Sequence, residues 1–270
     1  MNIFPIIVTY CTDYHSTAVY QNLIRFYPDC QLLIYDNSPT SINKKYGNEN
    51  QKYIHDATNG GVTAAYNAGA SIAKEMGKSH IVLFDQDTIF NKDYLNILEA
   101  DIRQHPDINL MVPAILYGKQ RPFSPVRMAF LSIQPVCLGV GEYSLRDYLP
   151  VNSGACINLS AFEQVGGYNE CIKLDFADFD FFQRLIPVSH KFLIVDSVAF
   201  QQFSNQETDI EKLMNRFQLY IADARNYQGR RSIAFHVLRH TIALSIRCRS
   251  IRFITYYIRH YLSSKPATAL

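Results

Sequence analysis

The pattern of hydrophobic and polar positions along the first 115 residues is of two kinds, strand-length apolar runs and helical spacing. Short apolar runs of strand length recur at residues 3–9, 31–35, 53–54, 81–84 and 110–116. Between them, apolar residues fall at helical spacing over residues 16–26, 62–76 and 91–103. Such runs are typical of strands buried on both faces, and the intervening spacing is typical of amphipathic helices. The pattern predicts an α/β fold with a mostly parallel central sheet flanked by helices.

Periodicity is weaker in the second part of the chain. Residues 119–149 contain several Pro and Gly, which predicts loops and short strands. Residues 151–159 are apolar with Asn152, Ser153 and Gly154 among them, the apolar run at residues 191–195 predicts a further strand, and residues 210–227 predict a helix. Ser160 and Glu163 form a capping box, so we expect a short helix to begin there and to end near Gly167.

The last part of the chain differs in charge. From Ala224 to the end there are nine Lys or Arg and no Asp or Glu. We therefore expect a domain over residues 1–205, with halves at 1–115 and 116–205, and a basic helical extension over 206–270. Arginines among apolar residues are typical of a helix lying on an anionic membrane. The alternative is a helix packed on the domain with a solvated basic face.

Composition excludes several classes of protein. The net charge of the 270 residues is only +2, so no nucleic-acid partner is indicated. The six cysteines form no C-x-x-C pair, which argues against a zinc or redox site and favours free thiols in a reducing cytosol. The N-terminus is typical of a first strand and not of a signal peptide, and no apolar run is long enough to span a membrane.

Two carboxylates, Asp85 and Asp87, follow the apolar run at residues 81–84. Binding groups gather at the carboxyl edge of an open α/β sheet, and residues i and i+2 of an extended chain face the same way. Paired carboxylate oxygens are hard ligands suited to Mg²⁺ or Mn²⁺, which in turn bind diphosphate. The alternative is a turn that caps the next helix. There is no G-x-G-x-x-G after the first strand and no G-K-[ST], so neither a dinucleotide fingerprint nor a P-loop is present.

A second acidic group lies in residues 174–185, where Asp175, Asp178 and Asp180 alternate with aromatic residues. Burying three acids among phenylalanines is costly unless they have a task. If the segment is helical throughout, Asp175 and Asp178 share nearly the same face. The alternative is an amphipathic helix with an acidic exposed side.

Seven short pieces in one order over the first 205 residues carry a family resemblance. They are V-T-Y at 8, D-N-S at 36, N-G-G-V-T-A-A-Y-N-A-G at 59, D-Q-D-T at 85, N-S-G-A at 152, G-G-Y-N at 166 and A-D-F-D-F-F-Q-R at 177. Together they resemble family 2 of the glycosyltransferases, which are inverting enzymes with a GT-A fold that use nucleotide-diphospho-sugars. D-Q-D and D-F-A-D-F-D look most similar to the rhamnosyltransferase branch. That likeness implies dTDP-L-rhamnose as the donor in bacterial surface polysaccharide synthesis, with UDP-glucose, UDP-galactose or UDP-galactofuranose as alternatives.

The resemblance also implies roles for individual residues. Asp178 would be the general base, and Asp87 would bind Mg²⁺ or Mn²⁺. Asp36 would accept a hydrogen bond from N3–H of uracil or thymine. The binding site for the donor nucleotide would be lined by Thr9, Tyr10, Asp36, Asn37, Asn59, Asn67, Asp85 and Gln86. The acceptor, a glycan or lipid-linked oligosaccharide, would meet Asn152, Ser153, Gly154, Gly167 and Tyr168.

One stretch departs from the family pattern. Members often have a His after the last core strand, but residues 200–205 read F-Q-Q-F-S-N, which leaves Gln202 as the candidate metal ligand. A neutral amide is a weaker ligand, so a non-catalytic nucleotide-sugar-binding subunit is one alternative. A nucleotidyltransferase is another, although it would need a Gly- and Arg-rich loop after the first strand. The resemblance and the basic tail together imply a cytoplasmic enzyme peripheral to the inner face of the cell membrane.

Overall fold

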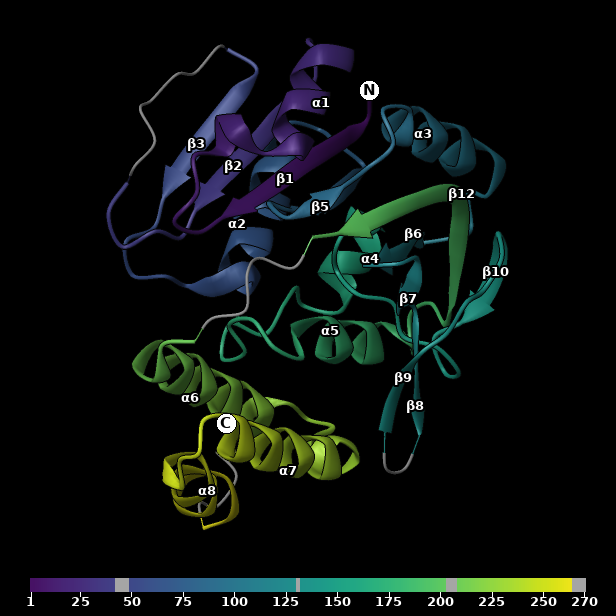
Figure 1. Ribbon diagram of the computed structural model, residues 1–270. Coiled ribbons are helices and arrows are strands. Elements are labelled where there is room, and N and C mark those ends of the chain that lie inside the picture. Colours follow the sequence, from purple (N-terminus) through teal and green to yellow (C-terminus); the bar gives the residue numbers. More distant parts are fainter. Residues whose placement is uncertain (42–48, 130–131, 203–207, 264–270) are drawn as a thin grey trace.

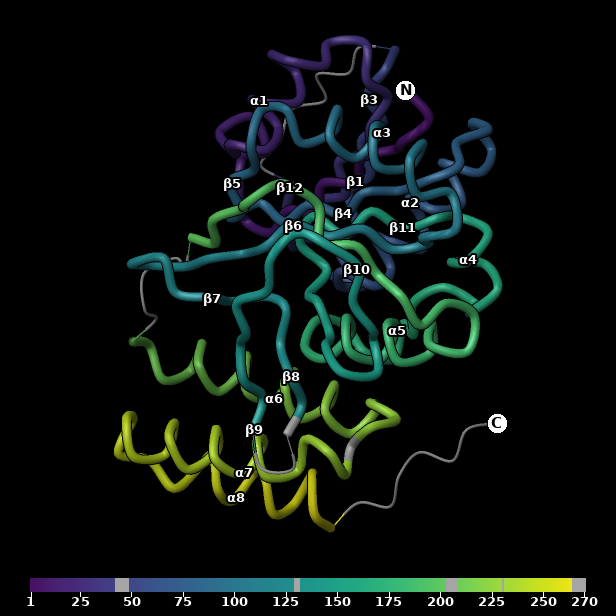
Figure 2. Tube along the Cα trace, turned by 90° about the vertical axis from the view of Figure 1, so that its right-hand side faces the viewer, coloured from purple at the N-terminus to yellow at the C-terminus, as the bar shows by residue number. Residues whose placement is uncertain are grey.

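The computed structural model describes residues 1–41, 49–129, 132–202 and 208–263. The predicted loop at residues 40–51 and the stretch at 200–205 therefore lie partly outside the described residues. A twisted sheet has helices on both faces, and a group of C-terminal helices lies beside one of these helical layers (Figure 1; Figure 2). The prediction of an α/β fold with a sheet flanked by helices is confirmed.

The first half of the sheet is parallel. Its strands lie in the order β3, β2, β1 and β4, with bounds Gln51–His55, Leu32–Asp36, Ile3–Thr9 and His80–Asp85. The register pairs Thr9 with Asp36 and Val8 with Asp85, so the polar ends of three strands lie side by side. Open α/β sheets bind their ligands at this carboxyl edge.

The second half of the sheet is mixed. β11 (Cys156–Asn158) is antiparallel to both β4 and β6 (Leu110–Tyr117), and β12 (Lys191–Gln201) is parallel to β6. The parallel prediction therefore holds best for the first half. The remaining strands are short: β5 (Thr88–Ile89), β7 (Arg121–Ser124), β8 (Val126–Ala129), β9 (Ser132–Pro135) and β10 (Gly141–Ser144).

Each face of the sheet has its own helices because side chains alternate along a strand. Phe4, Ile6 and Val8 of β1 belong to one buried cluster, and Ile3 and Ile7 belong to the other. The first cluster includes residues of α2 (Gly61–Glu75), α4 (Leu159–Gln164) and α5 (Ala177–Leu185). The second includes residues of α1 (Ala18–Phe26) and α3 (Tyr94–Gln104).

The cap of α4 differs from the prediction. Asn158, at the end of β11, accepts hydrogen bonds from the backbone N–H of Ser160 (2.9 Å) and Ala161 (3.3 Å). The predicted capping box is therefore wrong, because Asn is an equally good N-cap residue and here it precedes Ser160. Glu163 forms an ion pair with Lys74 instead, at 2.5 Å.

The C-terminal extension is helical, as expected. It consists of α6 (Ile210–Asn226), α7 (Arg230–Arg247), α8 (Arg252–Tyr257) and a final π-helical turn at Ile258–Leu262. Phe217, Val237 and Phe253 from these helices belong to the same buried cluster as Phe4 and Ile6 of β1. Among the described residues, none of the helices has the length and apolar character needed to cross a bilayer.

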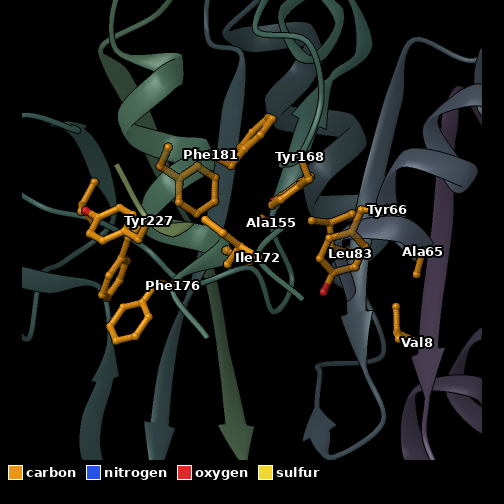
Figure 3. Close-up of a cluster of buried hydrophobic side chains, with 14 of the residues drawn as sticks. Val8, Ala65, Tyr66, Leu83, Ala155, Tyr168, Ile172, Phe176, Phe181 and Tyr227 are labelled. Carbon is orange, nitrogen blue, oxygen red and sulfur yellow. The ribbon is translucent and has the colours of Figure 1, made fainter. Parts of the chain in front are cut away.

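Aromatic rings link α2 to the C-terminal helices, as Figure 3 shows. Tyr168 lies 5.1 Å from Tyr66 between ring centroids and stacks on Phe181 at 4.3 Å. Farther along, Phe176 stacks on Tyr227 at 5.9 Å. The helix α5 is therefore held from both sides by packed aromatic side chains.

Candidate active site

Asp85 and Asp87 lie at the end of β4, half-buried. An oxygen of Asp85 accepts a hydrogen bond from the hydroxyl of Tyr66 at 3.3 Å. Burial raises the pKa of Asp85 to about 6, and the charge of Asp87 acts in the same direction. Burial also raises the pKa of Asp87, although a hydrogen bond from Gln201 lowers it. Two carboxylates that repel each other in a poorly solvated place favour a bound cation.

Gln86 joins this edge to the end of β1. Its Oε1 accepts from the backbone N–H of Tyr10 at 2.8 Å, and its Nε2 donates to the Tyr10 carbonyl at 3.4 Å. The side chain of Tyr10 is left 48% exposed. The neighbouring Thr9 is buried, and within the described residues its hydroxyl has no hydrogen-bond partner. The predicted position of these three residues at one edge is thus observed, with Gln86 bonded to the protein itself.

Asp36 has no exposed surface. Its carboxylate accepts hydrogen bonds from the backbone N–H of Ser38 (3.0 Å), from the Ser38 hydroxyl and from the hydroxyl of Tyr53 (2.7 Å). Neither carboxylate oxygen of Asp36 is accessible, so the expected hydrogen bond from the N3–H of a base cannot form in this conformation. Asn37 is also buried, with Nδ2 donating to the Gly61 carbonyl at 3.2 Å. Both side chains therefore stabilise the turn after β2 through hydrogen bonds to the protein itself.

The turn before α2 contacts the segment that precedes α5. Asn59 and Gly61 both have positive φ, and a Cβ on Gly61 would lie 2.2 Å from the carbonyl oxygen of Lys173. Only glycine permits this approach without displacing the neighbouring backbone. Val62 N–H donates to the same carbonyl at 2.8 Å, and Lys173 Nζ donates to the Asn59 carbonyl at 2.9 Å.

Asn67 holds the loop that carries Gly167 and Tyr168. Its Oδ1 accepts from the Tyr168 N–H at 2.8 Å, and its Nδ2 donates to the Tyr168 carbonyl at 3.0 Å and to Glu170 at 2.9 Å. A Cβ on Gly167 would lie 2.7 Å from Asn67 Oδ1. In this structure the amide that was predicted to line the donor site is used to position a loop.

The five predicted acceptor residues come together, and all five are buried. The hydroxyl of Tyr168 donates to Asn152 at 2.6 Å. Ser153 donates to the hydroxyl of Thr88 at 2.8 Å, and Thr88 donates to Gln201 at 2.6 Å. This chain of hydrogen bonds runs from the predicted acceptor residues towards Asp87. Sequence reasoning missed Thr88 and Gln201, which carried no distinctive pattern.

Asp178 lies in the first turn of α5. Phe176, the residue just before α5, has φ at +65° and packs against Tyr220 and Tyr227. An oxygen of Asp178 accepts from the Phe179 N–H at 2.8 Å. Burial raises the pKa of Asp178 to about 7, and the charges of Asp175 and Asp85 add to the effect. The electrostatic coupling to Asp85 brings the two predicted acidic groups into one site.

The other two acids of this segment have arginine partners. Asp175 pairs with Arg216 of α6 through two contacts, one of them 2.8 Å long. It precedes the helix, so the expectation that it shares a helical face with Asp178 is wrong. Asp180 is buried and pairs with Arg184 at 2.9 Å. Within the described ranges only Asp178 of the three acids has no arginine beside it.

Asp223 of α6 holds the segment before α5, and sequence reasoning missed it. Its two oxygens accept from the backbone N–H groups of Lys173, Leu174 and Asp175, at 2.8, 2.9 and 2.9 Å. Asp223 is 1% exposed. It falls on the apolar face of α6, and a charged residue at such a core-facing position is the signal that could have found it.

Metal ligands are few at this site. In the parts of the chain that the structure describes, no three side chains of His, Cys, Asp or Glu converge as a metal-binding group. The backbone N–H of Gln202 donates to the Asp87 carbonyl at 2.8 Å, and Gln202 is exposed. A carboxylate with a neighbouring amide oxygen suits a hard cation that completes its coordination with water and phosphate oxygens.

Comparisons with known proteins agree with this geometry. The family described as "Glycosyl transferase family 2" matches residues 16–157. Residues 1–349 of S. aureus TarS, solved with UDP, are 14% identical with a TM-score of 0.57, covering 98% of this chain and 76% of that solved chain. GalNAc-T7, solved with UDP, GalNAc and Mn²⁺, is 15% identical with a TM-score of 0.60, covering 96% of this chain and 57% of GalNAc-T7. No curated protein sequence matches the chain.

Proposed function

The chain belongs to glycosyl transferase family 2, and from that premise we propose that it moves a sugar from a nucleotide-diphospho-sugar to a hydroxyl group with inversion. The observation that carries this proposal is Asp178, a half-buried residue in the first turn of α5 whose pKa is raised to about 7, mainly by desolvation and to a smaller extent by the charge of Asp85. A carboxylate that titrates near neutral pH is well suited to take a proton in catalysis.

The mechanism is a single displacement. Asp178 accepts the proton of the acceptor hydroxyl while the hydroxyl oxygen forms a bond to the anomeric carbon of the sugar. The bond between that carbon and the diphosphate oxygen breaks at the same time, and its electron pair leaves with the nucleoside diphosphate. Attack and departure occur on opposite faces, so the anomeric configuration inverts. Asp85 orients the sugar, and Tyr66 orients Asp85 through the hydrogen bond of 3.3 Å.

Asp87 and Gln202 would hold Mg²⁺ or Mn²⁺ beside the diphosphate. The raised pKa values of Asp85 and Asp87 support this role, because a dication would relieve the repulsion between the two carboxylates. When bound, the metal neutralises the charge that develops on the departing diphosphate. The presence of Mn²⁺ and UDP in the GalNAc-T7 structure supports a divalent metal for this chain.

The donor is proposed to carry a pyrimidine base. TarS has been solved with UDP and with UDP-GlcNAc, and GalNAc-T7 with UDP, which supports a nucleoside diphosphate of this class. The D-Q-D and D-F-A-D-F-D patterns favour dTDP-L-rhamnose as the first candidate. UDP-sugars are the second candidate, which the two structural neighbours favour. The exposed ring of Tyr10 is the group that would stack on the base.

The acceptor is proposed to be a glycan or a lipid-linked oligosaccharide of a bacterial surface polysaccharide. The floor of its site would be formed by five buried residues: Asn152, Ser153, Gly154, Gly167 and Tyr168. The basic C-terminal helices support work at the cytoplasmic face of the cell membrane. A non-catalytic subunit that only binds the nucleotide-sugar is the remaining candidate, which the absence of a His at residues 200–202 favours.

The donor and the activity can be tested together. We expect release of nucleoside diphosphate from one member of a panel of dTDP-rhamnose, UDP-glucose, UDP-galactose, UDP-galactofuranose, UDP-N-acetylglucosamine and GDP-mannose. Donor-induced thermal shifts run in parallel. A thermal shift without release in the presence of membrane acceptors would favour the non-catalytic subunit.

Metal removal should lower the rate of donor turnover about a hundredfold, because several kcal/mol of charge stabilisation would be lost. Release of nucleoside diphosphate is measured with EDTA and then with added Mn²⁺ or Mg²⁺. Gln202→His should lower the Mn²⁺ concentration that gives half of the maximal rate, because imidazole binds Mn²⁺ better than an amide does. Unchanged turnover in EDTA would remove the metal from the proposal.

A further inference from the structure

The helix α7 is apolar on two sides, and only one of them is covered. Ile233, Val237 and Leu244 are at most 8% exposed and belong to the main buried cluster. An uncovered row lies elsewhere on the same helix: Phe235, Leu238, Ile242 and Ile246, which are 43%, 37%, 44% and 72% exposed. Intervals of three and four residues place this row on one face. A continuous row of exposed large apolar side chains marks an interaction surface, so this row needs a partner.

Arginines surround this row. Arg231 precedes Phe235 by four residues and Arg239 precedes Ile242 by three, so both are on the same side of α7, and both are exposed. Beyond the helix, Ile251 is 73% exposed in the turn to α8. The sequence from Ala224 to the end contains no acid. The face therefore combines apolar side chains with positive charge only.

We propose that this face of α7, formed by Phe235, Leu238, Ile242 and Ile246 with Arg231 and Arg239, docks on an anionic lipid bilayer. Its aliphatic and aromatic groups enter the boundary between headgroups and acyl chains, and the guanidinium groups meet lipid phosphates. The inference rests on the membrane contact of the proposed function and specifies the surface that makes it.

The positive charge of the α7 face favours a bilayer over a second copy of the chain as its partner. A symmetric dimer through this face would bring the same arginines of two copies together. With no acid in the sequence from Ala224 onwards to pair with them, such an interface would concentrate like charges and be penalised. An anionic bilayer supplies both the apolar layer and the opposite charge.

The position of α7 fits an acceptor that is held in the membrane. α7 packs on α6, and α6 supplies Asp223 and Arg216 to the segment before α5. In Figure 1, α6 and α7 lie one below the other beneath α5. Docking through the outer face of α7 would therefore bring Asp178 near the bilayer, where a lipid-linked hydroxyl is presented.

Vesicle pelleting of the full chain tests the surface. The vesicles contain phosphatidylcholine with phosphatidylglycerol, or phosphatidylcholine alone. Ile242→Gln/Ile246→Gln should lower partition onto the anionic vesicles at least about tenfold, because two large apolar groups are lost. Arg231→Gln/Arg239→Gln should lower it about fivefold per arginine, and added salt should weaken the wild type in the same way.

Matched controls separate this face from apolar exposure and charge in general. Val140→Gln removes an exposed apolar group, and Lys52→Gln/Arg103→Gln removes two charges elsewhere on the surface. Both should pellet like the wild type. Equal pelleting of the α7 variants and these controls would overturn the proposal. A second result would also overturn it: the wild type does not bind vesicles but forms a dimer in sedimentation velocity, and Ile242→Gln/Ile246→Gln abolishes that dimer.

Binding and catalysis are read separately. Asp178→Asn should pellet with anionic vesicles as the wild type does, since Asp178 lies in α5 and is not part of the α7 face. If every donor in the panel is inert and pelleting still follows the α7 variants, the proposed function fails and the docking surface stands.

Discussion

Asp178→Asn is expected to lower the rate of sugar transfer about a thousandfold and to retain binding of the nucleotide-sugar. The amide has nearly the shape of the carboxylate but cannot take a proton from the acceptor hydroxyl. Its oxygen can keep the hydrogen bond from the Phe179 N–H that Asp178 accepts at 2.8 Å, so the first turn of α5 is preserved. Release of nucleoside diphosphate gives the rate, and the donor-induced thermal shift gives the binding.

The same substitution should stabilise the protein at alkaline pH. The pKa of Asp178 is raised from 3.8 to about 7, so the folded state binds the proton more tightly than the unfolded state does. Stability contributed by this group therefore falls as pH rises from about 4 to about 7, by up to about 4 kcal/mol. Near pH 8 we expect Asp178→Asn to melt at a higher temperature than the wild type, with little difference near pH 4.

Activity should show the opposite pH trend. The unprotonated carboxylate is the base, so kcat/KM of the wild type should fall as pH drops below about 7. Asp107→Asn removes an exposed carboxylate and serves as the matched control for both measurements. Substantial transfer by Asp178→Asn would assign the base to another group, and a lower melting temperature near pH 8 would contradict the burial penalty.

Asp223→Ala is expected to destabilise the protein by about 3 kcal/mol, because three partly buried backbone N–H groups lose their acceptor. Those groups belong to Lys173, Leu174 and Asp175, directly before α5. A shift of this segment would misplace Asp178, so kcat should fall about a hundredfold with a smaller change in the KM for the donor. Hydrogen exchange of residues 173–175, thermal melting and steady-state kinetics measure the three effects.

Gln218→Ala is the matched control, since Gln218 is an exposed residue of the same helix. It should leave hydrogen exchange, stability and kcat unchanged. If Asp223→Ala lowers stability but kcat at a temperature where the protein is folded stays at the wild-type value, Asp223 supports the fold without positioning Asp178. Such a result would also separate the role of α6 from the chemistry.

The strands β1, β2 and β4 of the parallel half were predictable because each contains a continuous apolar run, whereas β3 showed only Tyr53 and Ile54. The run at residues 3–9 became β1 without a change of boundary, and the acids after residue 84 lie at the sheet edge where parallel strands bring polar ends together. The second half was harder because β11 has only three residues, Cys156–Asn158, and lies antiparallel between β4 and β6. So short a run carries no periodicity that would reveal its direction.

Roles within the site were less predictable than positions. The resemblance assigned Asp36, Asn67 and Tyr168 to ligand binding, and in the structure their polar atoms bond to the protein itself. A sequence motif shows which residue stands at a place and not which of its neighbours will take its hydrogen bonds. Asp223 was missed for the same reason, because its partners are backbone N–H groups, which every sequence has.

The contacts between α6 and the segment before α5 also limit where related chains can recombine. Asp223 and Arg216 come from the C-terminal extension, and the groups they hold come from residues 173–175. A hybrid that joins this catalytic half to the C-terminal helices of a relative would lose both attachments unless residues 173–175 were exchanged with them. Recombination is therefore expected to preserve a boundary before residue 173 rather than the domain boundary expected at residue 206, and α6 is inherited with the proposed catalytic base.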